Sequence, residues 1–414
     1  MKTRHLYYGL MMAAVVFISC KKNNDRPSPG KGKDLVLTAE EQQQVLADNA
    51  FNFKMFKNLA ADPKLNRNLI FSPLSISMAL SMTGNGASGS TLEQMRKVLE
   101  QKAFTEEQIN SYHKKLNTEL PQLDPLADLQ LANSIWYRQG FTPLPAFIDL
   151  NKNNYNAAVE SLDFNNPAAK DRINGWVAKN TKDKIPTILD NIGSDIVMYL
   201  INAVYFKSDW KYPFDKNKTR KETFYTNENK SIQADFMQGK VTVKTGVFNG
   251  VRVAELPYGN EKYSMLLLLP EEGKSIMDVV NGTDTTTWNS WMKGLRPSTV
   301  ELHFPKFKFA FKTKLNTPLI DLGMPIPFSN SADFSRINQG GGLLISEVLH
   351  KAFIEVNETG TEAAAVTSVS MELTAIIPGT AVFIVDRPFI FVIREMKTGL
   401  ILFNGIVRNP LLAE

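Results

Sequence analysis

The stretch from Glu358 to Ile377 limits most strictly what this chain can fold into. It reads E-T-G-T-E-A-A-A-V-T-S-V-S-M-E-L-T-A-I-I, and neither Lys nor Arg occurs between Glu358 and Asp386. Successive side chains of a β-strand point to opposite faces. One face of such a strand would be small or apolar, with Thr361, Ala363, Ala365, Thr367, Val369 and Met371. The other face would carry a charge at each end, and it would hold Glu362, Ala364, Val366, Ser368, Ser370 and Glu372.

This alternation allows the stretch to enter a sheet with its first face buried. It contains no proline, so every backbone N–H can donate to a ladder. Pro378-Gly379 then marks a turn. Composition alone leaves a plainer reading open, in which the stretch is an edge strand or a mobile linker. The flanking sequence decides between these readings.

Both flanks of the stretch resemble the hinge and the C-terminal signature of the serpins. The resemblance rests on H-K-A-F-I-E-V-N-E-T-G-T-E-A-A-A from His350 to Ala365, and on D-R-P-F-I-F-V-I-R-E-M-K-T-G-L-I-L-F-N-G-I-V-R-N-P from Asp386 to Pro410. Serpins expose the intervening loop to a protease, and after the cut the hinge slides into a large sheet as a new strand, an established example of strand addition. The resemblance thus implies a reactive loop over about residues 358–385. It also implies a hinge that contains Glu358, Gly360, Thr361, Ala363, Ala364 and Ala365.

Three further blocks resemble serpin segments and follow the family order. The first is N-L-I-F-S-P-L-S-I-S-M-A-L-S-M-T-G-N-G-A-S-G-S-T-L-E-Q-M from Asn68 to Met95, the second comprises Asn202, Tyr205, Phe206, Lys207 and Trp210, and the third is L-P-Y-G-N-E-K-Y-S-M-L-L-L-L-P from Leu256 to Pro270. The resemblance therefore covers nearly all of residues 38–410. It implies one α+β domain with the serpin fold, which has three β-sheets and eight or nine helices.

The resemblance also implies two clusters of side chains around the central sheet. A buried polar cluster where the sheet opens would contain Ser72, Ser75, Asn202 and His350. At the entry point of the hinge, the breach, Lys306 would pair with Glu358 beside Trp210. A charge in place of Thr361 would be buried without a partner, at a cost of several kcal/mol. The run of Gly360, Thr361 and Ala363 to Ala365 also resembles that of inhibitory serpins, and this resemblance favours an inhibitor over a relative that does not insert its loop.

Family spacing from Glu358 places the scissile bond at Thr374-Ala375. The loop is somewhat longer than in well-known serpins, so the alternatives Met371-Glu372, Leu373-Thr374 and Ala375-Ile376 stay open. Such residues suit elastase-like, subtilisin-like and some papain-like proteases, whereas trypsin-like enzymes need Lys or Arg. We expect a monomeric inhibitor whose partner is a serine or cysteine protease, held in a covalent complex.

Periodicity predicts the individual elements. A capping box at Thr38 and Glu41 begins a helix. One helix is predicted over residues 276–295, and separate strands over 232–237 and 241–247. One strand is predicted over Thr299–Phe311 with Pro305 at a bulge, and a long strand over Leu343–Val356 leads to the hinge.

The N-terminus predicts export. Lys2 and Arg4 precede an apolar run and then Ser19-Cys20, which is the pattern of a signal peptide over residues 1–19. The position of Cys20 resembles the lipobox of bacterial lipoproteins, although Phe17 departs from the usual Leu, and plain secretion is the alternative. The polar, Pro- and Gly-rich residues that follow predict a flexible tether over 20–37 and one domain over 38–414. We expect a lipid anchor at Cys20 and a place in the bacterial cell envelope, on the periplasmic or surface face of the outer membrane.

Composition agrees with one large domain and excludes several functions. The 414 residues are 43% hydrophobic and 21% charged, which is enough for a sizeable core. The net charge of +5 is small and no Lys/Arg run exceeds two residues, so nucleic acid is not expected. Cys20 is the only cysteine, which excludes an internal disulfide. No metal or cofactor signature occurs, and none is expected.

Enzyme motifs occur only as fragments. Ser208-Asp209-Trp210-Lys211 is an S-x-x-K sequence, and K-T-G occurs at 244–246 and 397–399, as in β-lactamases. That chemistry needs its serine at the start of a helix, whereas Ser208 follows a β-rich stretch and Tyr212-Pro213 prevents a helix. We therefore expect an inhibitor and not an enzyme. Two alternatives stay open, namely a serpin that binds without inhibiting and, more remotely, an envelope hydrolase that uses Ser208.

Overall fold

The computed structural model describes residues 30–226, 230–361 and 381–413. The strands in these residues form two β-sheets. The first sheet runs in the order β10 (Phe307–Lys314), β11 (Leu349–Val356), β12 (Gly360–Thr361), β4 (Met198–Asp209), β2 (Ala127–Arg138) and β3 (Ala158–Leu162). The second runs in the order β1 (Leu69–Phe71), β15 (Ile401–Val407), β14 (Phe389–Glu395), β8 (Tyr263–Pro270), β7 (Val251–Pro257), β6 (Ser231–Phe248), β9 (Arg296–Pro305) and β13 (Ala381–Ile384), and β5 (Arg220–Tyr225) also pairs with β6.

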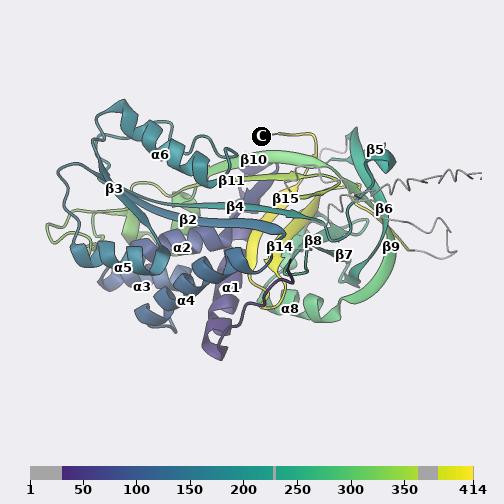
Figure 1. The fold of residues 1–414 in the computed structure, drawn as a ribbon, viewed down its shortest axis with the longest axis horizontal. Coiled ribbons are helices and arrows are strands. Elements are labelled where there is room, and N and C mark those ends of the chain that lie inside the picture. The colour runs from purple at the N-terminus through teal and green to yellow at the C-terminus, as the bar shows by residue number, and fades with distance from the viewer. Residues whose placement is uncertain (1–29, 227–229, 362–380, 414) are drawn as a thin grey trace, which may run out of the picture. The chain divides into compact units, whose positions relative to one another are not determined.

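Nine α-helices occur in the described residues. They are α1 (Ala39–Ala61), α2 (Pro73–Gly84), α3 (Gly89–Val98), α4 (Glu106–Glu119), α5 (Pro145–Tyr155), α6 (Pro167–Asn180), α7 (Ile276–Gly282), α8 (Thr285–Gly294) and α9 (Asn316–Asp321). The predicted capping box of Thr38 and Glu41 begins α1, and Ser72 caps α2 with Pro73 at its first position. Across the six-stranded sheet, α6 packs against one side of β4 and α2 against the other (Figure 1).

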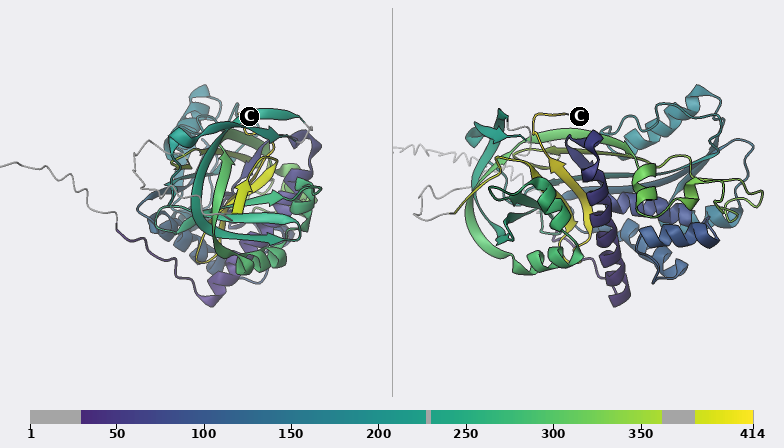
Figure 2. Two further views of the ribbon diagram at one scale, coloured as in Figure 1. Left: turned by 90° about the vertical axis from the view of Figure 1, so that its right-hand side faces the viewer. Right: turned by 180° about the vertical axis from the view of Figure 1, so that it is seen from behind.

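The core lies between the two sheets and under α1. Every residue of β8, β14 and β15 is buried, and Phe307 of β10 contacts the rings of Phe389 and Phe391 of β14. On the far side, α1 packs against β15 (Figure 2). A sheet that is covered on both faces needs continuous apolar strands, and Leu266–Leu269 of β8 meets that requirement.

The described strands join into two sheets, although we expected three. The long strand β6 makes the connection, because its residues 236–245 pair with β9 while its residues 244–248 pair with β7. The separate strands predicted over 232–237 and 241–247 are therefore one strand. The α+β class and the helix count agree with the prediction.

Three predicted elements are corrected. The helix expected over 276–295 is two helices, because α7 ends at Gly282 and the Asp284 side chain caps α8 by accepting from Thr287 N–H. The strand expected over 299–311 is two strands, since the chain leaves one sheet at Pro305 and enters the other at Phe307. The strand before the hinge begins at Leu349 and not at Leu343.

The tether was predicted to extend to residue 37, but its last residues pack on the domain. Lys33 N–H donates to Leu123 O at 2.6 Å, and Leu35 is 1% exposed. Asp34 binds Lys262 at 2.7 Å and Lys397 at 3.0 Å. The domain therefore begins before residue 38. Within the described part of the chain, no helix combines the length and the apolar character needed to cross a membrane.

Candidate functional site

The start of the hinge already lies in the six-stranded sheet as β12. Gly360 pairs with Asp209 and Thr361 with Ser208, both on β4. On the other side, Thr361 pairs with Val356 of β11. The two residues therefore separate β4 from β11 at one end of the sheet.

Gly360 occupies a position that has no room for a side chain. A Cβ atom built there would lie 2.2 Å from Ser208 O and 2.7 Å from Asp209 Cα. Both contacts are with backbone, which cannot move aside without disturbing β4. The close approach of the hinge to β4 thus requires glycine.

The Thr361 side chain is buried and bonded inside the sheet. It is 3% exposed, and its hydroxyl shares a short hydrogen bond with the hydroxyl of Tyr258. The Tyr258 ring stacks on Trp210 with 4.5 Å between centroids and 9° between planes. Trp210 Nε1 donates to Asn357 O at 2.9 Å, so the Trp210–Tyr258 stack contacts the chain just before Glu358 and again at Thr361. Burial keeps the pKa of Tyr258 well above its ordinary value, and the hydroxyl stays neutral.

Glu358 is anchored beside this stack. Its side chain accepts from Lys306 Nζ at 3.0 Å and from Thr219 Oγ1 at 2.8 Å, and the residue is only 4% exposed. Burial tends to raise the pKa of Glu358, but hydrogen bonds from its own backbone, Thr219 and Lys306 outweigh burial, and the pKa lies below its ordinary value. The structure therefore brings together Lys306, Glu358 and Trp210, the three residues expected at the breach.

Beyond Thr361, a slot separates β4 from β11. In the described residues β4 pairs with β2 and β12, and β11 with β10 and β12, but no ladder joins β4 to β11 directly. A cavity of about 110 Å³ lies at the far part of this slot. Its polar lining includes Ser75, Asn202 and His350. The facing edges of β4 and β11 thus frame a space that a further strand could enter.

Three of the four residues predicted for the polar cluster are linked by hydrogen bonds. Ser72 N–H donates to His350 Nε2 at 3.2 Å, and Ser75 N–H donates to Ser72 Oγ at 3.2 Å. Burial lowers the pKa of His350 to about 4, so the ring is neutral at pH 7. Because Nε2 accepts a hydrogen bond, the proton resides on Nδ1.

Asn202 lines the same cavity but bonds elsewhere. Its Nδ2 donates to Asn133 Oδ1 at 2.7 Å, because the two residues face each other across β4 and β2. Its Oδ1 is buried without a hydrogen-bond partner in the described structure. The expected cluster is thus incomplete, and it leaves an unused acceptor at the slot.

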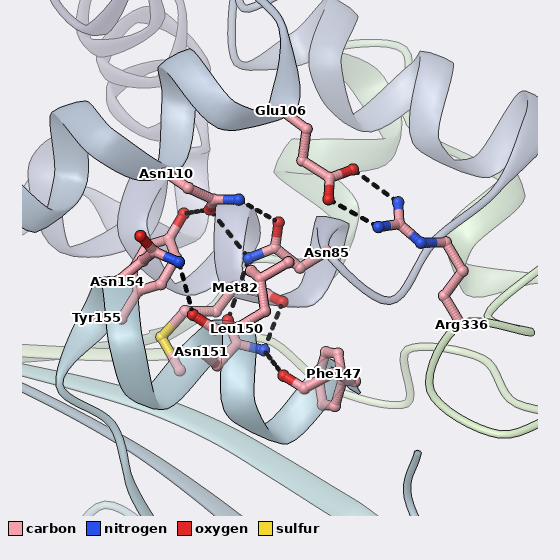
Figure 3. A network of polar contacts seen from close by, with 10 residues as sticks. All are labelled: Met82, Asn85, Glu106, Asn110, Phe147, Leu150, Asn151, Asn154, Tyr155 and Arg336. Atoms are coloured by element: carbon pink, nitrogen blue, oxygen red, sulfur yellow. Dashed lines mark hydrogen bonds and ion pairs between the residues drawn. The ribbon is translucent and has the colours of Figure 1, made fainter. Parts of the chain in front are cut away.

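A network of buried amides supports the helix behind the cavity (Figure 3). Asn85, which ends α2, donates to Asn110 Oδ1 of α4 at 3.0 Å and to Asn151 Oδ1 of α5 at 3.2 Å. Tyr155 donates its hydroxyl to the same Asn110 oxygen at 2.9 Å. This network ties α2 to α4 and α5, and α2 supplies part of the cavity wall.

Sequence reasoning missed several of these partners. Tyr258 lies in the recognised L-P-Y-G block, but no local pattern indicates that it meets Thr361, 103 positions away. Asn133 lies 69 positions from its partner Asn202, and Thr219 lies 139 positions from its partner Glu358. Only the register of the strands brings these side chains together.

The enzyme fragments do not form a catalytic site in the described residues. Ser208 is 1% exposed, and its hydroxyl donates to Leu126 O at 3.4 Å. Lys211 forms an ion pair with Glu261 at 2.7 Å. No group of three or more His, Cys, Asp or Glu side chains within the described ranges is arranged to hold a metal ion.

Several predicted sites lie outside the described residues. They are the reactive bond at Thr374-Ala375 with its alternatives at 371–376, the hinge residues Ala363, Ala364 and Ala365, and Cys20. These sites stay predictions.

The sheet, the hinge and the breach together define a serpin. The model of the family described as "Serpin (serine protease inhibitor)" matches residues 46–410, and the chain belongs to this family. The predictions of the family and of the fold class are thereby confirmed.

The proteins similar to this chain include an elastase inhibitor and a thyroxine-binding globulin. The leukocyte elastase inhibitor of Xenopus laevis is 34% identical over 372 residues, covering 87% of this chain and 97% of that protein. Tengpin, a thermophilic serpin solved in its native state, superposes with a TM-score of 0.83 at 32% identity, covering 93% of this chain and 98% of its own. Human thyroxine-binding globulin, solved with thyroxine, gives a TM-score of 0.82 at 29% identity, covering 91% and 100%.

Proposed function

We propose that this protein inhibits serine or cysteine proteases by inserting its cut loop into the slot between β4 and β11. One observation carries the proposal: β12 already occupies the head of that slot, in register with both neighbouring strands. Among the described strands, none other than β12 lies between β4 and β11, so a loop that continued from Thr361 would enter between these two strands.

The register of β12 gives the position of each residue that follows. If the ladder continues without a bulge, Ala363 will lie between Phe206 and Ile354, Ala365 between Val204 and Ala352, and Thr367 between Asn202 and His350. Thr367 would then bring a hydroxyl donor to Asn202 Oδ1, the buried acceptor without a partner. A buried acceptor gains most from a new hydrogen bond.

Insertion would compete with hydrolysis of the acyl-enzyme. The protease Ser or Cys attacks the scissile carbonyl, the new amino terminus leaves, and an ester or thioester holds the protease on the loop. Each backbone hydrogen bond is worth about 0.5–1.5 kcal/mol net, so a strand bonded on both edges gains on the order of 10 kcal/mol. That gain drives the loop, with its bound protease, along the sheet before water can attack.

The target specificity follows from the loop residues. We assign the reactive bond to Thr374-Ala375, with Met371-Glu372, Leu373-Thr374 and Ala375-Ile376 as alternatives. Elastase-like, subtilisin-like and papain-like enzymes are the proposed targets. A second candidate is a serpin that binds without inhibiting, because thyroxine-binding globulin has the same fold.

A denaturing gel tests the proposal. Residues 31–414 are mixed with pancreatic elastase, subtilisin and papain, and we expect an SDS-stable band at the summed mass with release of a short C-terminal peptide. In a Thr361→Arg variant the buried charge blocks entry, so the loop should be cut without trapping. Complete cleavage of the unmodified protein with full protease activity left would favour the binding protein instead.

A further inference from the structure

We infer that a groove at the ends of α1, α7 and β15 binds a phosphate monoester with a small apolar group. The groove has a volume of about 670 Å³ and lies outside the slot and the hinge. Its cationic lining consists of Lys274, Arg387 and Arg408. The site goes beyond the proposed protease inhibition and does not depend on it.

Arg408 is the strongest evidence for an anion. The residue follows β15 and is 6% exposed, yet no carboxylate of the described chain forms an ion pair with it. Its Nε donates to Arg67 O at 3.1 Å and its backbone N–H to Asn68 Oδ1 at 2.8 Å, and neither acceptor carries a charge. Burial lowers the pKa of Arg408, and no neighbouring carboxylate offsets that effect. A buried cation without a counterion is unfavourable, and a bound anion would supply the missing partner.

The two other cations keep donors free for a ligand. Arg387 uses Nε to bind Asp386, its chain neighbour, at 2.8 Å, so its two Nη groups are not used in that contact. Lys274 Nζ donates to the backbone oxygen of Asn249 and has further protons to donate. Guanidinium groups bind phosphate oxygens in pairs, which favours phosphate over a spherical anion.

The carboxylates near the groove are already engaged. Asp62 lines the groove, and its Oδ1 accepts from Lys64 N–H at 2.9 Å at the start of a short helical turn. Asp386 is held by Arg387. Arg67 offers Arg408 only its backbone oxygen, because its own guanidinium lies over the Phe311 ring and donates to Lys312 O at 3.2 Å. The local charge is therefore positive.

The rest of the lining indicates what carries the phosphate. Ile276, Met277 and Pro388 form apolar wall beside the cations. Bare phosphate would leave this wall in contact with water. An ester with a ring or short chain would cover it, and burial of apolar area gives about 25 cal/mol per Å².

Calorimetry on residues 31–414 tests the site with two probes, phenyl phosphate and inorganic phosphate, at constant ionic strength. We expect phenyl phosphate to bind with a submillimolar Kd, more tightly than inorganic phosphate. Arg408→Gln and Arg387→Gln should each weaken it at least tenfold. The matched control is Arg220→Gln, which removes an exposed arginine outside the groove and should leave the Kd unchanged.

Any of three results would overturn the inference as stated. One is the absence of any heat of binding at phenyl phosphate concentrations up to 10 mM, because a Kd of 10 mM corresponds to a binding free energy of only about −3 kcal/mol. The second is equal weakening in Arg220→Gln and Arg387→Gln, which would indicate only general attraction. The third is equal affinity for the two probes, which would refute the ester and the role of the apolar wall. Should Arg408→Gln fail to fold, Arg387→Gln and Lys274→Gln decide the question, because both residues lie at the surface of the groove.

Discussion

At the scale of single residues, three hinge positions depend on different physical effects. Gly360 is required because backbone atoms of β4 leave no space for a Cβ. Thr361 is required to be small and uncharged because it is buried against Tyr258. The Glu358 carboxylate accepts hydrogen bonds from a charged donor, Lys306 Nζ, and a neutral donor, Thr219 Oγ1. Each effect predicts the result of a separate substitution.

Substitution Gly360→Ala should turn the protein from an inhibitor into a substrate. The new Cβ would meet Ser208 O at 2.2 Å, so the hinge must leave the sheet or displace β4. We expect elastase to cut the loop while the yield of SDS-stable complex falls at least tenfold. The control is Gly175→Ala in α6, where a Cβ meets nothing within 4 Å. Full trapping by Gly360→Ala would contradict the close approach of hinge and sheet.

Substitution Glu358→Lys should open the breach and promote polymers. It places two lysines together at a site that is 4% exposed, and it removes the acceptor of Thr219. Because the Lys306 side chain is 38% exposed, breaking this pair costs less than the about 3–5 kcal/mol of a fully buried pair. Native gels and size-exclusion chromatography after mild heating should show oligomers. Glu272→Lys changes an exposed loop residue by the same charge and should stay monomeric; monomers from both variants would refute the prediction.

The sequence predicted a side-chain contact only where the resemblance to the serpins pairs the two residues. Glu358, Lys306 and Trp210 were predicted together, and the structure places them together. The links from Thr361 to Tyr258 and from Asn202 to Asn133 were not predicted, because they depend on strand register across distant parts of the chain. Local patterns carry no information about such register.

At the scale of elements, the hinge strand β12 sets the register of the loop residues that would follow it in the sheet.

The errors in the predicted strands also arise because local sequence patterns do not show which strands pair. The alternating apolar pattern continues from β9 into β10, although the chain passes from one sheet to the other at Lys306. Periodicity alone therefore cannot show that the strand is broken there. Likewise, β6 reads as two strands because its middle residues are polar on one face, although pairing with β9 continues through them.

Paired cysteines test the register of insertion. In the protein from residue 31 on, which has no cysteine, Ala365→Cys and Ala352→Cys should form a disulfide only after the loop is cut. The pair faces each other in the extended register, and facing residues in a ladder bring Cα atoms to about 4.5–5.5 Å. The offset pair Ala365→Cys with Ile354→Cys should not crosslink. Crosslinking of the offset pair alone would show that the strand enters in another register.

At the scale of the whole molecule, buried titratable groups couple stability to pH. Burial lowers the pKa of His350 to about 4 and that of His113 to about 3, from an ordinary 6.5. The unfolded chain therefore binds more protons below pH 6.5, and stability falls as the pH drops from 6.5 toward 4. Asp48 acts in the opposite sense, because burial raises its pKa from 3.8 to about 6, and its contribution is lost as the pH rises through that range.

We expect the melting temperature to fall between pH 7 and pH 4.5, because the combined pKa shifts of His350 and His113 are larger than the opposing shift of Asp48. Burial also raises the pKa of Asp209, which acts in the same sense as Asp48. The shift of His350 alone corresponds to about 3 kcal/mol. A His350→Gln variant should be less stable than the unmodified protein at pH 7, but its melting temperature should fall by less when the pH is lowered. The same pH dependence in His350→Gln and the unmodified protein would show that His350 does not titrate in this way.

The central claim is that the cut loop becomes a strand between β4 and β11. Hydrogen exchange followed by mass spectrometry measures this directly, in peptides that cover β4 and β11 before and after elastase cleaves the loop. We expect exchange to slow in both strands after cleavage, and we expect no slowing in Thr361→Arg cut to the same extent. Unchanged exchange in β4 and β11 of the cleaved unmodified protein would contradict insertion.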